Sequence, residues 1–72
     1  MATTTDLKKL RVLLPHWIEH NAEHAAGFQE WAEKARAAGQ EEVAEEIALA
    51  AKELGWANEA LSAALKKLEQ AA

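Results

Sequence analysis

The sequence predicts an all-α fold in which two long helices pack as an antiparallel hairpin. Two observations favour this fold: apolar residues recur at alternating steps of three and four in both halves of the chain, and Gly39 lies between the halves. Such steps build a continuous stripe along a helix, because about 3.6 residues complete one turn. The 72 residues suffice for one small domain, which we expect to span residues 1–72.

The first helix is expected over about residues 4–38. It begins among Thr3 to Asp6, whose side-chain oxygens suit the free N–H groups of a first turn. Its stripe comprises Leu7, Leu10, Leu14, Trp17, Asn21, His24, Phe28, Trp31 and Ala35. We expect this stripe to form the seam against the second helix, with the polar residues Asn21 and His24 inside it.

Pro15 lies inside the first helix and is the only proline of the chain. It lacks the N–H that would pair with the carbonyl of Arg11, and its ring disfavours helical geometry at Leu14. The stripe keeps its phase on both sides of Pro15, which favours a kinked but continuous helix. The alternative is a break at Leu14–Pro15, with Pro15 at the first position of a new helix.

The second helix is expected over about residues 41–70, after a loop at about residues 38–40. Gly39 suits the left-handed conformation that closes a helix, and Glu41 and Glu42 place negative charge at the positive end of the second helix dipole. The second stripe comprises Val43, Ile47, Ala50, Leu54, Ala57, Leu61, Ala64 and Leu68. A turn centred on Gly39 then sets Asn21 opposite Ala57.

Leu49 and Trp56 lie on the side of the second helix opposite its stripe, at about 100° of rotation per residue. A tryptophan beside a leucine on an exposed surface usually marks a contact with another molecule. We therefore expect a homodimer in which two hairpins form a four-helix bundle through the Leu49/Trp56 face. The alternative is that Trp56 covers part of its own chain.

Composition excludes several classes of function. The formal net charge of −4 argues against nucleic acid as a partner, because phosphates require a basic surface. The chain has no cysteine and therefore no thiol chemistry, and no apolar run approaches the ~18 residues of a membrane span. The first residues lack the basic and apolar segments of a signal peptide, so we expect a soluble, cytoplasmic protein.

All histidines of the chain lie in one stretch, and together they predict a metal site. His16, His20 and His24 are spaced four residues apart, so their imidazoles form a ladder on one face of the first helix. Two histidines at i and i+4 can share one metal, whereas three along one helix seldom complete a tetrahedral shell. Glu23 or a second subunit would supply the missing ligands. This donor set suits a divalent transition metal, namely nickel, cobalt, zinc or copper.

These residues predict a metal-binding helical module that buffers, delivers or senses a transition metal. The alternative is a non-catalytic dimerisation or interaction module in which Asn21 and His24 set the pairing, a known role of polar residues in helical seams. An enzyme is not expected, because the sequence contains no HExxH pattern, no nucleophile–base pair and no phosphate-binding loop.

The stretch HWIEHN, followed two residues later by His24 and then by FQEWAEKA, resembles small uncharacterised helical domains of archaea and bacteria. Such domains are loosely associated with nickel or cobalt uptake and handling. The resemblance covers about Leu10 to Ala35 and does not extend to the second helix. It implies metal handling, with His16, His20 and His24 as the candidate ligands.

Overall fold

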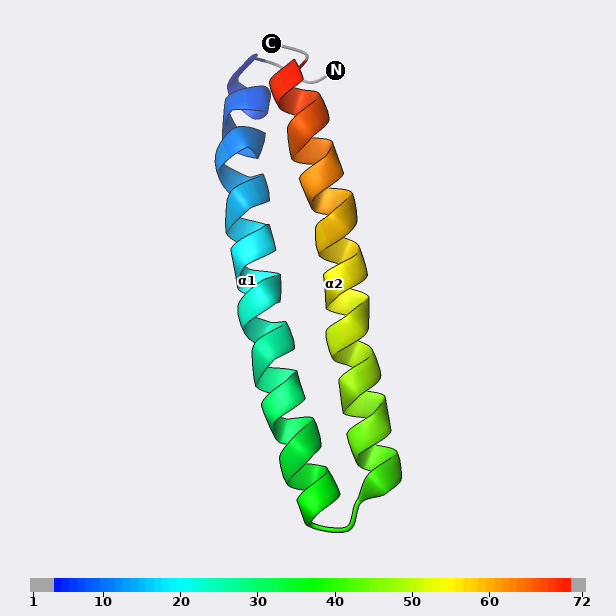
Figure 1. Cartoon of the computed structure of the whole chain (residues 1–72). Helices are drawn as coiled ribbons and strands as arrows, with labels where there is room; N and C mark the ends of the chain where they lie inside the picture. The colour runs from blue at the N-terminus through cyan, green and yellow to red at the C-terminus, as the bar shows by residue number, and fades with distance from the viewer. Residues whose placement is uncertain (1–3, 71–72) are drawn as a thin grey trace.

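The computed structural model describes residues 4–70, which form two helices joined by a short loop. Helix α1 spans Thr4–Ala37 and helix α2 spans Glu41–Gln70. The helices lie side by side and antiparallel, so that the start of α1 and the end of α2 share one end of a rod measuring 52 × 18 × 14 Å (Figure 1). The predicted all-α hairpin is therefore confirmed, and residues 4–70 contain no strand.

The loop is closed by Gly39, as predicted. Its φ of 82° is left-handed, which glycine adopts without the steric cost that a Cβ would bring. The N–H of Gly39 donates to the carbonyl of Arg36 at 3.0 Å, and the N–H of Gln40 donates to the carbonyl of Ala35 at 2.9 Å. These two bonds form a Schellman motif, which satisfies carbonyls at the end of α1. The Arg36 guanidinium also pairs with the Glu41 carboxylate at 3.0 Å across the loop.

Helix α1 passes through Pro15 without a break, so the alternative of two separate helices is wrong. The missing N–H at Pro15 leaves the carbonyl of Arg11 without its usual helical partner. Pro15 and Arg11 are both exposed, and water can therefore solvate that carbonyl. The continuous stripe of seam residues on both sides of Pro15 then holds the helix against α2.

On each helix most of the predicted seam lies in the interface, but some predicted members are exposed and the next residue along the chain takes their place. On α1, Trp17, His24 and Trp31 are exposed, and the residues that follow them lie in the interface: Ile18, Ala25 and Ala32. On α2, the exposed residues are Val43, Ala57 and Ala64, and their neighbours Ala44, Asn58 and Leu65 lie in the interface. The predictions that placed Trp17, His24 and Trp31 in the seam are therefore wrong.

Side-chain size explains this shift. The buried residues are Leu14, Ala32, Ala44 and Ala51, so three of the four are alanines that let the helices approach closely. Tryptophan rings at the same positions would hold the helix axes apart and leave gaps in the packing. On α1 the stripe with the smaller residues therefore forms the contact. On α2 the same holds at Ala44, whereas Asn58 and Leu65 are larger than the exposed Ala57 and Ala64 that precede them.

A pair of asparagines fixes the level at which the helices face each other. The Asn21 amide donates to the Asn58 side-chain oxygen at 3.1 Å, and the Asn58 amide donates to the carbonyl of Ile18 at 2.9 Å. Both side chains are half-buried near the middle of the hairpin. Asn21 therefore faces Asn58 and not Ala57, which corrects the predicted register by one residue.

Replacing Gly39 by alanine is expected to lower the free energy of unfolding by about 1 kcal/mol, because an L side chain is strained at a left-handed φ. The matched control is Gly55→Ala in α2, where a Cβ would meet nothing within 4 Å. That substitution should raise the free energy of unfolding by up to about 1 kcal/mol. Urea denaturation measures both, and shifts of the same sign would contradict this account.

Asn58→Ala removes both side-chain hydrogen bonds and leaves the amide of Asn21 unpaired, so it should cost about 1 kcal/mol of stability. Asn21→Leu combined with Asn58→Leu replaces both amides with apolar groups and should be neutral or stabilising. Urea denaturation of this double variant, and of Asn21→Leu and Asn58→Leu made singly, gives the interaction free energy. Strictly additive effects would show that the two amides are not coupled.

Candidate metal centre

The three histidines form a ladder along the flank of α1 and not in its seam. Adjacent ring centroids are 6.1 Å apart for His16 and His20, and 4.5 Å apart for His20 and His24. The Phe28 ring continues the row, with its centroid 6.0 Å from that of His24. The histidines are exposed, so their ring nitrogens are accessible from water. The i, i+4 spacing alone produces this arrangement, because each residue lies one turn above the previous one.

His20 and His24 are the closest pair of potential ligands, with 2.8 Å between their Nε2 atoms. Two nitrogens bound at right angles to one metal at about 2.0–2.1 Å lie about 2.9 Å apart, and at the tetrahedral angle they lie about 3.3 Å apart. The pair therefore has the spacing of two neighbouring ligands of a square-planar or octahedral metal. The same spacing also permits an Nε2–H of one ring to donate a hydrogen bond to the other.

A shallow hollow beside this pair is lined by His16, Glu19, His20 and Glu23. All four residues come from α1, so the hollow lies on a single helix and receives nothing from α2. Glu23, the predicted carboxylate ligand, is here with His16 and His20. Glu19 lies in the same hollow; its spacing of three from His16 and four from Glu23 is the sequence signal that places it there.

The predicted ligands therefore divide into two groups that share His20. His20 and His24 form the close nitrogen pair, whereas His16 and Glu23 line the hollow on the other side of His20. Within residues 4–70, no group of three or more histidine, cysteine, aspartate or glutamate side chains is arranged to hold a metal ion. Asn58 contributes no ligand, because its side chain is hydrogen-bonded within the seam.

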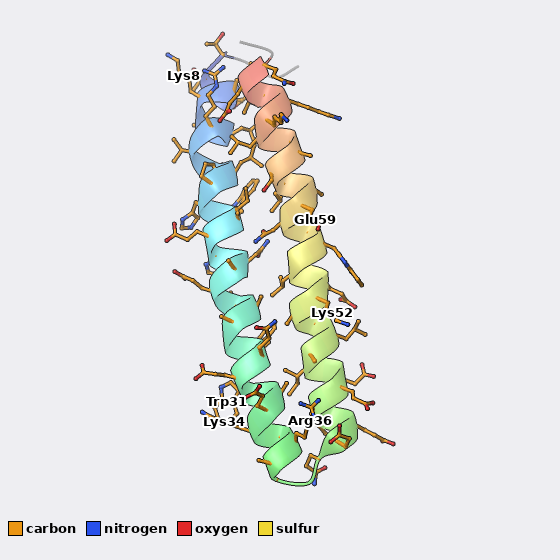
Figure 2. All side chains as sticks on the ribbon, in the orientation of Figure 1. Lys8, Trp31, Lys34, Arg36, Lys52 and Glu59 are labelled. Atoms are coloured by element: carbon orange, nitrogen blue, oxygen red, sulfur yellow. The ribbon has the colours of Figure 1, made fainter. Side chains whose placement is uncertain are left out.

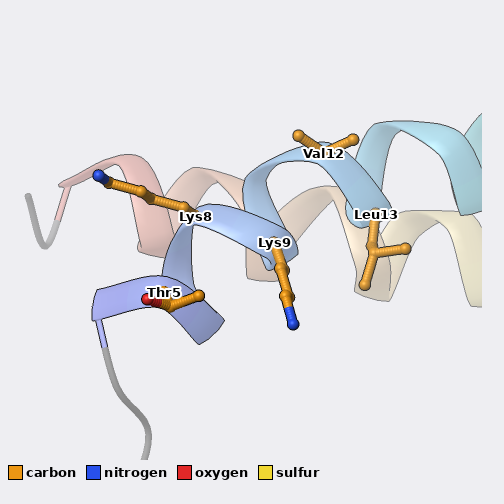
Figure 3. A pocket seen from close by; sticks show the side chains of 5 residues that line it. All are labelled: Thr5, Lys8, Lys9, Val12 and Leu13. Atoms are coloured by element: carbon orange, nitrogen blue, oxygen red, sulfur yellow. The ribbon is translucent and has the colours of Figure 1, made fainter.

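A second hollow lies on the first turns of α1, lined by Thr5, Lys8, Lys9, Val12 and Leu13 (Figure 3). Its surface is mostly apolar, and Figure 3 shows the side chains of Lys8 and Lys9 leaving the helix in different directions. It offers neither imidazole nor carboxylate. This hollow therefore has no ligands for a transition metal.

Large apolar side chains are exposed on two other surfaces. The predicted contact residues Leu49 and Trp56 are 41% and 58% exposed on the outer side of α2. On the flank of α1, Trp17 is 40% exposed and Trp31 is 61% exposed. The ammonium of Lys34 lies 4.4 Å from the centre of the Trp31 ring, and Figure 2 shows the two residues together near the loop. This cation–π contact covers only part of the ring.

Fold and site together define a small helical-hairpin protein with an imidazole ladder on one flank. The chain belongs to the family described as Domain of unknown function (DUF8180), whose family model matches residues 10–68. The matched range includes the whole ladder, the loop and almost all of α2. No curated protein and no solved structure matches the chain. Neither of the helices in residues 4–70 is long and apolar enough to cross a membrane.

The position of the ladder predicts how histidine variants affect folding. His24→Ala should change the free energy of unfolding by less than about 0.5 kcal/mol, because the side chain is exposed on the flank. Leu14→Ala, in the seam, should cost about 2 kcal/mol or more because it leaves a cavity between the helices. Thermal unfolding in a chelating buffer compares the two. If His24→Ala lowered the free energy of unfolding as much as Leu14→Ala does, the result would show that His24 packs in the seam.

Proposed function

We propose that the protein is a non-catalytic helical module that binds a divalent transition metal in order to buffer, deliver or sense it. The observation that carries this proposal is the 2.8 Å separation of the His20 and His24 Nε2 atoms. Imidazoles held at this spacing by one turn of helix chelate a metal without moving the backbone. The hollow on a single helix provides no walls that would exclude water from a substrate, which supports a binding role over catalysis.

Donor type and spacing restrict the metal. The near right-angle spacing of His20 and His24 favours copper(II) or nickel(II), which accept square-planar or tetragonal nitrogen ligands. Cobalt and zinc in tetrahedral sites require a wider nitrogen separation, which a rotation of either ring supplies. His16 and Glu23, which line the hollow that His20 shares, are the same-chain residues proposed as further ligands. The formal net charge of −4 adds a general attraction for cations.

A homodimer that forms a four-helix bundle is part of the same proposal. A two-helix hairpin of this size buries little, and its four buried residues include three alanines. The exposed Leu49/Trp56 face and the flank of α1 are two surfaces with large apolar side chains to cover. A bend of α1 at Pro15 also belongs to the proposal, supported by the missing N–H there. A cytoplasmic location is also part of the proposal.

The second candidate function is an interaction module without a metal. The exposed rings of Trp17, Trp31 and Trp56 favour it, since aromatic side chains are enriched at protein interfaces. In this case His20 and His24 would form only the hydrogen bond between their rings. Asn21 would fix the hairpin register in either case, because its partner Asn58 lies in the same chain.

Metal retention by the untagged protein tests the metal-binding proposal. The protein is exposed to an equimolar mixture of nickel, cobalt, zinc and copper, dialysed near neutral pH, and analysed by mass spectrometry for metal content. Wild type should retain near-stoichiometric metal. A variant with both His20→Ala and His24→Ala should lose at least about tenfold in affinity, because it lacks both chelating nitrogens.

The matched control is His16→Ala, which removes an imidazole of the same ladder but leaves the close pair intact. It should retain metal better than the double variant. Circular dichroism should show the same helix content in all three proteins, since the substituted side chains are exposed. Equal metal content in wild type and the double variant, or none in either, would leave the interaction module as the better hypothesis.

A further inference from the structure

One broad face of the hairpin carries a second heptad stripe that the hairpin leaves uncovered. On α1 each residue of this second stripe directly precedes a residue of the seam. The stripe, here called the flank stripe, comprises Leu13, Trp17, His20, His24, Gly27 and Trp31. Its steps alternate four and three without interruption, the spacing of a helix that packs against another helix. Residues 4–70 form only two helices, so this packing requires a helix from another molecule.

The flank stripe is complementary to itself. When two copies of this helix pack antiparallel, each stripe residue faces a stripe residue of the other copy. Dense packing is favoured where a large side chain faces a small one. Centred between His20 and His24, the pairing sets His20 of one copy against His24 of the other. It also sets Trp17 against Gly27 of the second copy. The two remaining members of the stripe also pair, with Leu13 of one copy facing Trp31 of the other.

Gly27 has no explanation within a single hairpin. It lies inside α1, where glycine weakens a helix, and a Cβ built on it would meet nothing within 4 Å. A facing tryptophan supplies the reason, because the ring of Trp17 from a second copy needs the space that a side chain at this position would fill. Gly55 in α2 also has open space around it but lies outside this face, which makes it a useful comparison.

Helix α2 presents a matching surface on the same face. An antiparallel hairpin has an approximate twofold axis perpendicular to its plane, so residues one position before the seam lie on the same side of both helices. On α2 these are Ala50, Ala57 and Ala64, which precede the seam residues Ala51, Asn58 and Leu65. Because Asn21 faces Asn58, Ala57 lies level with the midpoint between His20 and His24.

Both helices therefore define the same centre for a twofold pair. With Ala57 opposite its own copy, Ala50 faces Ala64 of the second copy, and these small residues permit close approach of the α2 helices. Glu46 comes within one residue of the level of Lys67 of the second copy, so opposite charges lie near each other at each end of this contact. The thin core of one hairpin, in which three of the four buried residues among residues 4–70 are alanines, is the other argument for a second copy as the occupant of this face.

We propose that two copies pack through the flank stripe, and that His20 and His24 of both copies form one four-imidazole metal site on the dimer axis. This inference rests on the proposed function and adds the partner that completes the site. Each chain contributes a nitrogen pair with the spacing of neighbouring ligands, and two such pairs make the planar nitrogen set that copper(II) and nickel(II) prefer. One described chain alone lacks a group of three ligands, as expected of half a site.

The test is the number of metals per assembly. Native mass spectrometry and sedimentation velocity are applied to the full chain titrated with nickel(II) alone and with copper(II) alone. The expected species is a dimer that holds one metal, and its copper(II) form should give the electron paramagnetic resonance signature of four equivalent nitrogens. A monomer with one metal, or a dimer with two, would overturn the shared site while leaving the proposed metal binding intact. Absence of retained metal would overturn both.

Two glycine variants test the face itself. Gly27→Leu should raise the dimer dissociation constant by at least about tenfold and weaken nickel retention, because the leucine fills the space for Trp17 of the second copy. Gly55→Leu should change neither, although both substitutions favour the helix. Circular dichroism checks that each variant is folded. Equal effects of the two variants on dimerisation, or no effect of Gly27→Leu, would overturn the flank stripe as the interface.

Discussion

The hydrogen bonds between Asn21, Asn58 and the carbonyl of Ile18 fix the register on which the other features of the hairpin depend. A two-helix seam of leucine and alanine tolerates sliding, because apolar contacts have no direction. Paired amides do not tolerate it, since a shift of one turn leaves polar groups half-buried and unpaired. The asparagines therefore decide which residues meet in the seam. They also fix the rotation of α1 about its own axis, which places the histidines, Trp17 and Trp31 outside the seam.

The sequence was sufficient to predict two helices, the glycine that ends the first and the hairpin itself, because heptad spacing and a left-handed glycine are local properties. It did not identify which of two adjacent apolar stripes forms the seam. Trp17 and Ile18 are both apolar, as are Trp31 and Ala32, so hydrophobicity alone cannot choose between them. On α1 packing makes the choice, since it favours the stripe whose side chains allow the closer approach. Asn58, level with Asn21 across the turn, was the polar signal that could have resolved the choice.

The candidate site was predictable in part for the same reason. Spacing by four places His16, His20 and His24 on one face of a helix whatever lies opposite. Spacing does not determine ring rotation, and it is rotation that brings the nitrogens of His20 and His24 together while the ring of His16 remains further away. Nor does it say whether the ladder faces α2 or water. That outcome follows from the seam, and it leaves the coordination of any bound metal open to ligands from outside the chain.

The position of Pro15 has a consequence for the order in which the parts of this molecule form. The residue removes one hydrogen bond from α1 directly before the ladder begins at His16. Helix nucleation is the costly step of helix formation, and a link between residues one turn apart holds a turn in place. A cation bound by His20 and His24 would act as such a link just beyond the weakest point of α1. Metal binding and helix formation in this segment would then be thermodynamically coupled, so that each would increase the other.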